Sequence, residues 1–194
     1  MIVNALVEGV LDEAAARRVL AECGHELGTC FGKRGWTYIQ ERIRGFSDSA
    51  RTVPVLILVD HMDTGFKCPP EVITRWIQDR HPHCLLRVVV PELESWFLAD
   101  RKNLAEFLRV PLSAIPARAE ELANPKQTLV NAARKSRSTR VRDALVPRRN
   151  STAQVGPLYT SELVRFIHGR WDIVAARRDA VSLDRCVRRV QELC

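Results

Sequence analysis

The sequence has no uninterrupted apolar stretch near the roughly 18 residues that a membrane span requires. Residues 1–7 carry no basic leader, and Glu8 interrupts the apolar run too early for a secretory signal. No short spacing is repeated among the six cysteines, which are Cys23, Cys30, Cys68, Cys84, Cys186 and Cys194. Such scattered cysteines are typical of reduced thiols rather than of a disulfide framework. We therefore expect a cytoplasmic protein with no membrane partner.

Nucleotide-binding and zinc-binding signatures are also missing. The chain has no Walker motif, and the glycines of residues 32–35 precede no strand-to-helix turn suited to a dinucleotide. Residues 23–30 and 81–84 contain His and Cys side chains but lack the paired Cys-x-x-Cys spacing of a structural zinc site. Local spacing supports no serine or cysteine nucleophile either, although one with a distant histidine partner stays open.

Charge is distributed unevenly along the 194 residues, whose formal net charge is +7. Residues 1–100 carry 11 Lys and Arg against 14 Asp and Glu, a net charge of −3, whereas residues 101–194 carry 19 against 9, a net charge of +10. This asymmetry predicts acidic groups with a specific task in the first half and a positive surface for a polyanion in the second. The alternative is a basic face that is merely solvated.

Strand and helix patterns alternate through residues 1–100. Apolar segments at residues 2–7, 53–59 and 84–90 predict strands, and the nearly continuous apolar character of 53–59 is typical of a parallel strand covered on both faces. Helices are expected from Asp12 as N-cap, over 36–44, over 71–79 and after Pro91, with a short further strand between the glycines of 24–35. The pattern predicts an α/β fold with a mostly parallel sheet and helices on both faces.

Residues 101–194 contain no segment with a strand pattern. Helices are expected over 161–169 and from Ser182, as N-cap, to near the end of the chain. We find no internal repeat and no linker long enough to separate domains. The second half is therefore expected to be a basic helical extension packed on an α/β core of residues 1–100, as one structural domain overall.

Acidic residues follow the predicted strands. Glu8 follows the first, Asp60 and Asp63 follow the strand at 53–59, and Glu92 and Glu94 follow the strand at 84–90. The carboxyl ends of parallel strands share one edge of a sheet, so these carboxylates are expected to converge. Their mutual repulsion favours a hard cation such as Mg²⁺ or Mn²⁺, which could polarise a phosphodiester and lower the pKa of a bound water.

A structural role is the alternative for each of these acidic residues. Glu8 and Asp60 could cap the turns that follow their strands. Glu92 and Glu94 lie in a predicted first helical turn, where a negative charge gains about 0.3–1 kcal/mol from the helix dipole. The combination of a glutamate after the first strand with an aspartate pair after a deeply apolar strand favours the functional interpretation.

Several motifs together resemble a bacterial family of unknown function with a TOPRIM-like core, related to the overcoming-lysogenization-defect nucleases. These motifs are Val7-Glu8-Gly9, Leu58-Val59-Asp60-His61-Met62-Asp63, Pro91-Glu92-Leu93-Glu94-Ser95-Trp96-Phe97-Leu98-Ala99-Asp100, Asn124-Pro125-Lys126, Val155-Gly156-Pro157-Leu158-Tyr159-Thr160 and Ser182-Leu183. The resemblance covers nearly the whole chain, and Glu-Leu-Glu-x-Trp is its most specific part. It implies a TOPRIM/Rossmann-like fold.

The resemblance also implies roles for the acidic residues. In the TOPRIM superfamily a glutamate after the first strand acts as general acid or base, and an Asp-x-Asp pair holds Mg²⁺. Glu8 matches the first role and Asp60 matches the start of the pair. Met62 occupies the second position of the pair, so Asp63 is expected to replace it from one residue further on. The spacing is also one residue too long for the Asp-x-Asp-x-Thr motif of haloacid-dehalogenase phosphatases.

These features predict a metal-dependent nuclease for DNA or RNA. The resemblance implies an effector in an antiviral module whose partner is an ATPase encoded nearby, and the alternative is a non-catalytic adaptor that binds nucleic acid or the ATPase. Glu8, Asp60 and Asp63 are the expected catalytic residues, and Glu92 and Glu94 are expected further metal ligands. The expected nucleic-acid contacts are Lys126, Arg134, Lys135, Arg137, Arg140, Arg142, Arg148 and Arg149.

Overall fold

Two compact units make up the part of the chain that the computed structural model describes, residues 1–193. The sheet unit comprises Met1–Val90 and the segment that begins at Ser182, and the helical unit is Pro91–Val181. The boundary that we expected after residue 100 thus lies between Val90 and Pro91. The last helix belongs with the sheet rather than with the basic helical segment.

The sheet unit contains four strands, β1 (Ile2–Val7), β2 (Glu26–Gly32), β3 (Val55–Asp60) and β4 (Cys84–Val89). All pair in parallel, in the order β2-β1-β3-β4. Leu6 of β1 lies beside Ile57 of β3, and Asp60 lies beside Val89 of β4. The predicted α/β fold with a parallel sheet is therefore confirmed, and the segment between the glycines of 24–35 is indeed a strand.

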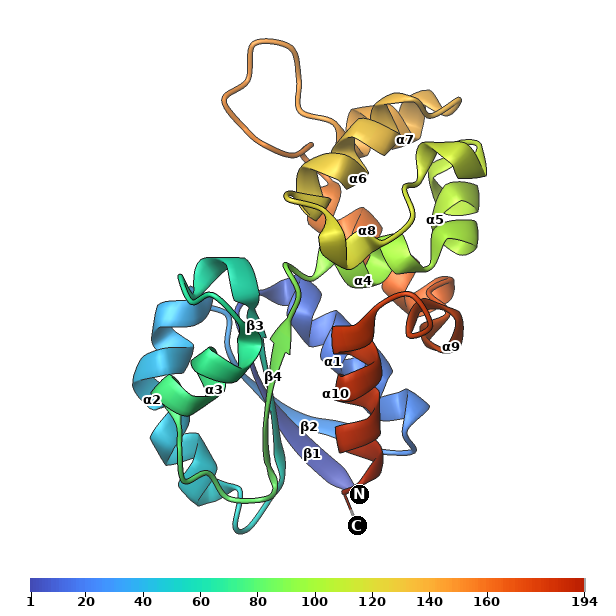
Figure 1. Ribbon diagram of the computed structural model, residues 1–194. Coiled ribbons are helices and arrows are strands. Elements are labelled where there is room, and N and C mark those ends of the chain that lie inside the picture. Colours follow the sequence, from blue (N-terminus) through green and yellow to red (C-terminus); the bar gives the residue numbers. More distant parts are fainter. Residues whose placement is uncertain (194) are drawn as a thin grey trace. The chain divides into compact units, whose positions relative to one another are not determined.

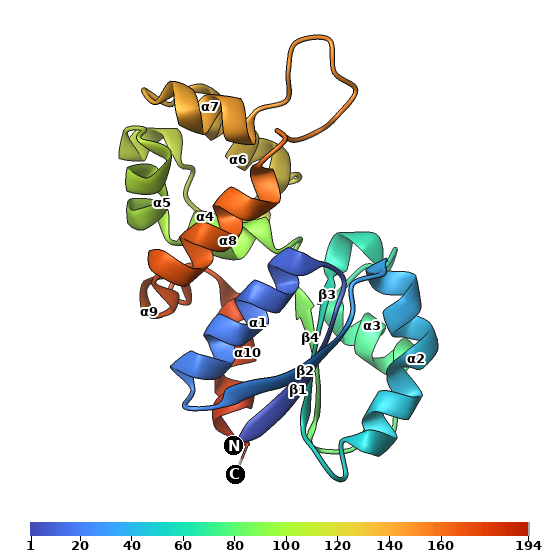
Figure 2. The same ribbon diagram turned by 180° about the vertical axis from the view of Figure 1, so that it is seen from behind.

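Helices cover both faces of this sheet. Helices α1 (Val10–Glu22) and α10 (Val181–Gln191) lie on one face, and α2 (Gly35–Ser49) and α3 (Pro69–Trp76) lie on the other (Figures 1 and 2). The central strand β3 is buried from Val55 through Val59, as its unbroken apolar sequence requires. Its side chains pack with Ile39 of α2 and Val72 of α3 in the main apolar core.

Two helix starts differ from the predicted ones. Helix α1 begins at Val10 after Gly9, and Asp12 lies in its first turn, where the carboxylate accepts the Gly9 N–H at 2.9 Å. Ser182 is likewise inside α10, and its hydroxyl accepts the Val90 N–H at 3.3 Å instead of capping its own helix. Both side chains accept a hydrogen bond from a backbone N–H. Which N–H donates depends on the segment of the protein that lies beside each helix start.

The helical unit has no strand within its described residues, as the sequence predicts. It contains α4 (Glu94–Ala99), α5 (Arg101–Leu108), α6 (Pro125–Arg134), α7 (Thr139–Leu145), α8 (Tyr159–Gly169), α9 (Ile173–Ala176) and the 3₁₀ helices η2 (Leu112–Ala114) and η3 (Ala119–Glu121). Aromatic side chains pack against one another within its core. The Phe97 and Trp171 rings meet edge to face at 5.4 Å, and the Trp171 indole N–H donates to the Trp96 carbonyl at 3.3 Å.

The helices of both units are short or amphipathic. Within residues 1–193, none combines the length and the apolar character that crossing a bilayer would demand.

Candidate metal centre

The strand order gives the sheet a topological switch point, where successive connections turn toward opposite edges of the sheet. From β1 the chain crosses by α1 to β2 at one edge, whereas from β3 it crosses by α3 to β4 at the other. In open parallel sheets, ligands bind beside the carboxyl ends of the two strands that flank such a point. Here those strands are β1 and β3, and the residues at their ends are Glu8 and Asp60.

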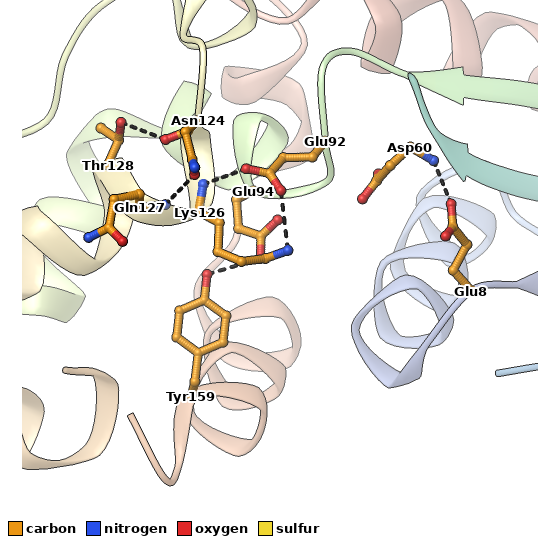
Figure 3. Close-up of polar contacts among 9 residues, drawn as sticks. All are labelled: Glu8, Asp60, Glu92, Glu94, Asn124, Lys126, Gln127, Thr128 and Tyr159. Atoms are coloured by element: carbon orange, nitrogen blue, oxygen red, sulfur yellow. Dashed lines mark hydrogen bonds and ion pairs between the residues drawn. The ribbon is translucent and has the colours of Figure 1, made fainter. Parts of the chain in front are cut away.

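Three carboxylates meet at this point. Glu8, Asp60 and Asp63 each offer one oxygen, and these oxygens all lie within 4.8 Å of one another. The Asp60 backbone N–H donates to Glu8 Oε1 at 2.7 Å, which ties the end of β3 to the side chain that follows β1 (Figure 3). Glu8 and Asp60 are half-buried and Asp63 is exposed. The predicted convergence of these three residues is confirmed, and their chemical roles stay a prediction.

A 3₁₀ turn accounts for the position of Asp63. Residues His61–Asp63 form the 3₁₀ helix η1, in which the Thr64 N–H donates to the His61 carbonyl at 3.1 Å. A 3₁₀ helix has three residues per turn, so side chains three positions apart fall on the same side. Asp60 is the extended N-cap of this turn and Asp63 is its last residue, so the turn brings the Asp63 carboxylate back toward Asp60 past His61 and Met62, which is 44% exposed.

The backbone of Glu8 is fixed by the loop after β2. The Lys33 N–H donates to the Val7 carbonyl at 2.8 Å, and the Gly35 N–H donates to the Glu8 carbonyl at 3.2 Å. Gly32 makes this approach possible, because a Cβ atom there would lie 2.4 Å from the Val7 oxygen and the residue has a φ of +91°. The position of the Glu8 carboxylate thus depends on a glycine in the neighbouring strand.

Replacing Gly32 with Ala should therefore weaken metal binding as well as the fold. The left-handed φ alone costs roughly 1 kcal/mol or more, and the backbone clash with Val7 adds to that cost and shifts the end of β1. Gly24→Ala is the matched control, since Gly24 has a φ of +78° but no atom within 4 Å of an added Cβ. Titration with Mn²⁺ should give a lower affinity for Gly32→Ala only. Equal affinities in the two variants would contradict this account of how Glu8 is positioned.

The donor set fits a hard divalent cation. Three carboxylates offer only oxygen ligands, which suit Mg²⁺, Mn²⁺ or Ca²⁺ better than the nitrogen- and sulfur-rich sites of zinc. Ligands on opposite sides of an octahedral Mg²⁺ lie about 4.2 Å apart, twice the metal–oxygen distance. Oxygens that are already within 4.8 Å of one another need to move by less than about 1 Å to share such an ion.

Glu92 and Glu94 lie in the helical unit and have their own cation there. Glu92 accepts the Lys126 backbone N–H at 2.7 Å, and the Lys126 ammonium lies 3.2 Å from Glu92 and 3.8 Å from Glu94 (Figure 3). The Tyr159 hydroxyl donates to Glu94 Oε1 at 3.0 Å. A lysine thus supplies a positive charge beside both glutamates, and their role as metal ligands stays a prediction.

Burial dominates the protonation of this second cluster. Desolvation raises the pKa of Glu94 to about 7, although Lys126 opposes the shift. Desolvation and the nearby Glu94 raise the pKa of Tyr159 well above its ordinary value, so its hydroxyl remains a donor. Lys126 and Tyr159 each stand in a motif of their own in the sequence, but no local pattern pairs them with the glutamates, because these partners come from helices far along the chain.

The predicted nucleic-acid contacts fall into two groups. Some are engaged within the helical unit. Lys126 pairs with the two glutamates, the Arg142 guanidinium donates to the Ser136 carbonyl and to Thr139 Oγ1, and Arg140 lies 3.6 Å from Glu162. The others are exposed on the same unit, and they are Arg134, Lys135, Arg137, Arg148 and Arg149.

Neutralising the five exposed residues together should weaken binding to every nucleic-acid sequence to a similar degree. Each phosphate contact that is lost should flatten the dependence of log K on log[salt] by about 0.7 for a single strand and about 0.9 for a duplex. Fluorescence anisotropy across a salt series would measure both effects. An unchanged slope would identify this segment as a solvated basic face.

Comparison with known proteins gives no further assignment. The chain matches no family model, no curated protein and no solved structure.

Proposed function

We propose that this protein is a metal-dependent nuclease that hydrolyses phosphodiester bonds, with its centre at Glu8, Asp60 and Asp63. The observation that carries the proposal is the convergence of these carboxylates at the switch point of a parallel sheet. Clustered carboxylates repel one another, and a bound cation in the working state would offset that repulsion. The order of acidic residues along the chain is also the one that the TOPRIM-like resemblance implies.

Each residue of the centre has a proposed role. Asp60 and Asp63 bind the cation from the two ends of a 3₁₀ turn, and Glu8 acts as a ligand or as the general base that accepts a proton from water. The Asp60 N–H orients the Glu8 carboxylate through the 2.7 Å hydrogen bond. The bound Mg²⁺ or Mn²⁺ would supply Lewis-acid stabilisation of the phosphoryl oxygen and a lowered pKa for a coordinated water.

The tyrosines favour hydrolysis over covalent strand transfer. A topoisomerase-type reaction needs an accessible tyrosine as nucleophile, and the chain has only Tyr38 and Tyr159. Tyr159 is 3% exposed and its hydroxyl is bonded to Glu94. The Tyr38 ring lies under the guanidinium groups of Arg34 and Arg42, at 5.4 and 5.9 Å.

The charge of the helical unit favours a polyanionic substrate. Residues 91–181 carry 16 Lys and Arg against 10 Asp and Glu, so most of the net positive charge of the protein lies there. A positive surface neutralises phosphates and releases their counterions, which is the main source of sequence-independent affinity for DNA and RNA.

A cleavage assay tests the proposed function. The full chain is incubated with labelled single-stranded DNA, duplex DNA and RNA in Mg²⁺, Mn²⁺ or chelator, with and without the ATPase that we propose as its partner. Cleavage of at least one substrate in metal, and its loss in chelator, is expected. Binding without cleavage under every condition would overturn the nuclease proposal and favour the non-catalytic adaptor.

A further inference from the structure

Four arginines line one pocket of about 200 Å³ in the helical unit. They come from separate segments of the chain, and they are Arg109, Arg140, Arg165 and Arg170. Only Arg140 belongs to the basic stretch that the sequence singles out. The other three are isolated in the sequence, so no local pattern of charge predicts that they meet.

Glu162 holds two of these arginines in place. It is 9% exposed, and its carboxylate accepts from Arg165 Nε at 3.1 Å and lies 3.6 Å from the Arg140 guanidinium. The Arg165 guanidinium also covers the Phe107 ring, 4.8 Å from its centroid. One nearly buried carboxylate and one aromatic ring thus fix guanidinium groups that would otherwise repel each other.

Arg109 carries charge that the pocket does not compensate. It is exposed, and across the part of the chain that the structure describes its guanidinium takes part in no hydrogen bond or ion pair. Glu106 lines the pocket 4.0 Å from Arg170, and Glu162 pairs with Arg140 and Arg165, so two anions are matched against four cations. The pocket is therefore positive even after its internal ion pairs are counted.

The backbone at Arg109 determines where its side chain lies. Arg109 is the C-cap of α5 and has a φ of +55°, in the left-handed region where glycine is the usual residue. A side chain in this conformation is strained, and such strain is concentrated at binding and catalytic sites. An arginine at this position costs stability and places a guanidinium at the mouth of the pocket.

We propose that this pocket binds a phosphate group of a nucleic-acid strand. A guanidinium group offers two parallel N–H donors to the oxygens of a phosphate group. Several guanidinium groups can surround one phosphate. A strand is favoured over a free phosphate because the Arg137 N–H donates to the Arg109 carbonyl at 3.2 Å, which joins the exposed basic segment to the pocket. The identity of the strand as substrate rests on the proposed function.

The decisive variant is Arg109→Gly, with Arg118→Gly as its matched control. Arg118 is also in the helical unit, has a φ of +56° and pairs with Glu121 at the surface, and it does not line the pocket. Each variant removes one positive charge and places glycine at one backbone position of left-handed conformation. Neither should therefore lower the melting temperature, and a difference between them reports on the pocket alone.

Binding of a fluorescent single-stranded oligonucleotide is measured in chelator, so that no cleavage occurs. Arg109→Gly should weaken binding about tenfold and reduce the salt slope by about 0.7, whereas Arg118→Gly should stay within about twofold of the wild type. Equal weakening in both variants, or none in either, would overturn the proposal. Displacement of the strand by polyglutamate at matched charge would overturn it in favour of an acidic protein partner.

The result is independent of the cleavage assay. If Arg109→Gly binds normally while metal-dependent cleavage is present, the pocket proposal fails and the nuclease stands. If no cleavage is found but Arg109→Gly alone loses affinity, the pocket stands and the nuclease fails. Inorganic phosphate at millimolar concentration should compete with the strand for the pocket. Equal affinity for strands with and without a 5′-phosphate would then assign the pocket to an internal phosphodiester.

Discussion

Asp60→Asn should abolish metal-dependent cleavage, with a loss of roughly 10³-fold or more in kcat/KM, equivalent to about 4 kcal/mol of transition-state stabilisation. The amide keeps the shape of the side chain but removes a charge that offsets the cation. Its backbone N–H still donates to Glu8, so the end of β3 should keep its position. The loss should therefore appear in the chemistry and in metal affinity rather than in the fold.

Thermal unfolding measures the stability of the fold and the binding of metal without relying on catalysis. Without metal, Asp60→Asn should be at least as stable as the wild type, because it relieves repulsion among three carboxylates within 4.8 Å of one another. A cation at 100 times its Kd should stabilise the wild type by about 2.7 kcal/mol, and this increment should be missing in the variant. Asp79→Asn, which neutralises an exposed carboxylate of the same unit, should behave as the wild type in both assays.

Two results would contradict the assignment of Asp60. One is full cleavage by Asp60→Asn, and the other is wild-type cleavage that persists in chelator. Either would remove the acidic centre from the reaction and leave the adaptor as the better description of the protein.

The second large effect concerns Glu94 and pH. Glu94 is 2% exposed, and burial raises its pKa from 4.5 to about 7. Between these two values the unfolded chain releases the proton while the folded protein still holds it. The folded protein therefore binds more protons, and its stability should fall as the pH rises from about 4.5 to about 7 and then level off, by roughly 3 kcal/mol from this group.

Glu94→Gln should remove this dependence. The amide stays neutral at every pH and its oxygen can still accept from Tyr159, so the variant should match the wild type near pH 4.5 and exceed its stability at pH 8. Urea unfolding at several pH values would measure the difference. Glu121→Gln is the control, because its side chain is 68% exposed.

Parallel pH profiles for the wild type and Glu94→Gln would show that Glu94 is ionised in the fold throughout this range. The variant should also keep the stabilisation that Mn²⁺ gives the wild type, since Glu94 is not a proposed ligand. Loss of that stabilisation would restore Glu94 to the metal site that the sequence alone suggests.

The sequence alone determined the α/β sheet and the order of acidic residues along it. An unbroken apolar segment such as 55–59 can be satisfied only by burial on both faces, and parallel pairing brings strand ends to one edge. The convergence of Glu8 with Asp60 follows from these two facts, and the 3₁₀ turn after β3 adds Asp63. The start of a helix is harder to predict, because Asp12 and Ser182 each accept from a backbone donor outside their expected cap.

Only the tertiary structure decided which charges are partners. Glu92 and Glu94 follow a strand as Glu8 and Asp60 do, yet they pair with Lys126, which lies more than 30 residues later. The four arginines of the pocket likewise come from separate segments. Ion pairs and desolvation depend on distance and burial in space, which periodicity and spacing do not encode, whereas the hydrophobic pattern of a strand is written directly in its residues.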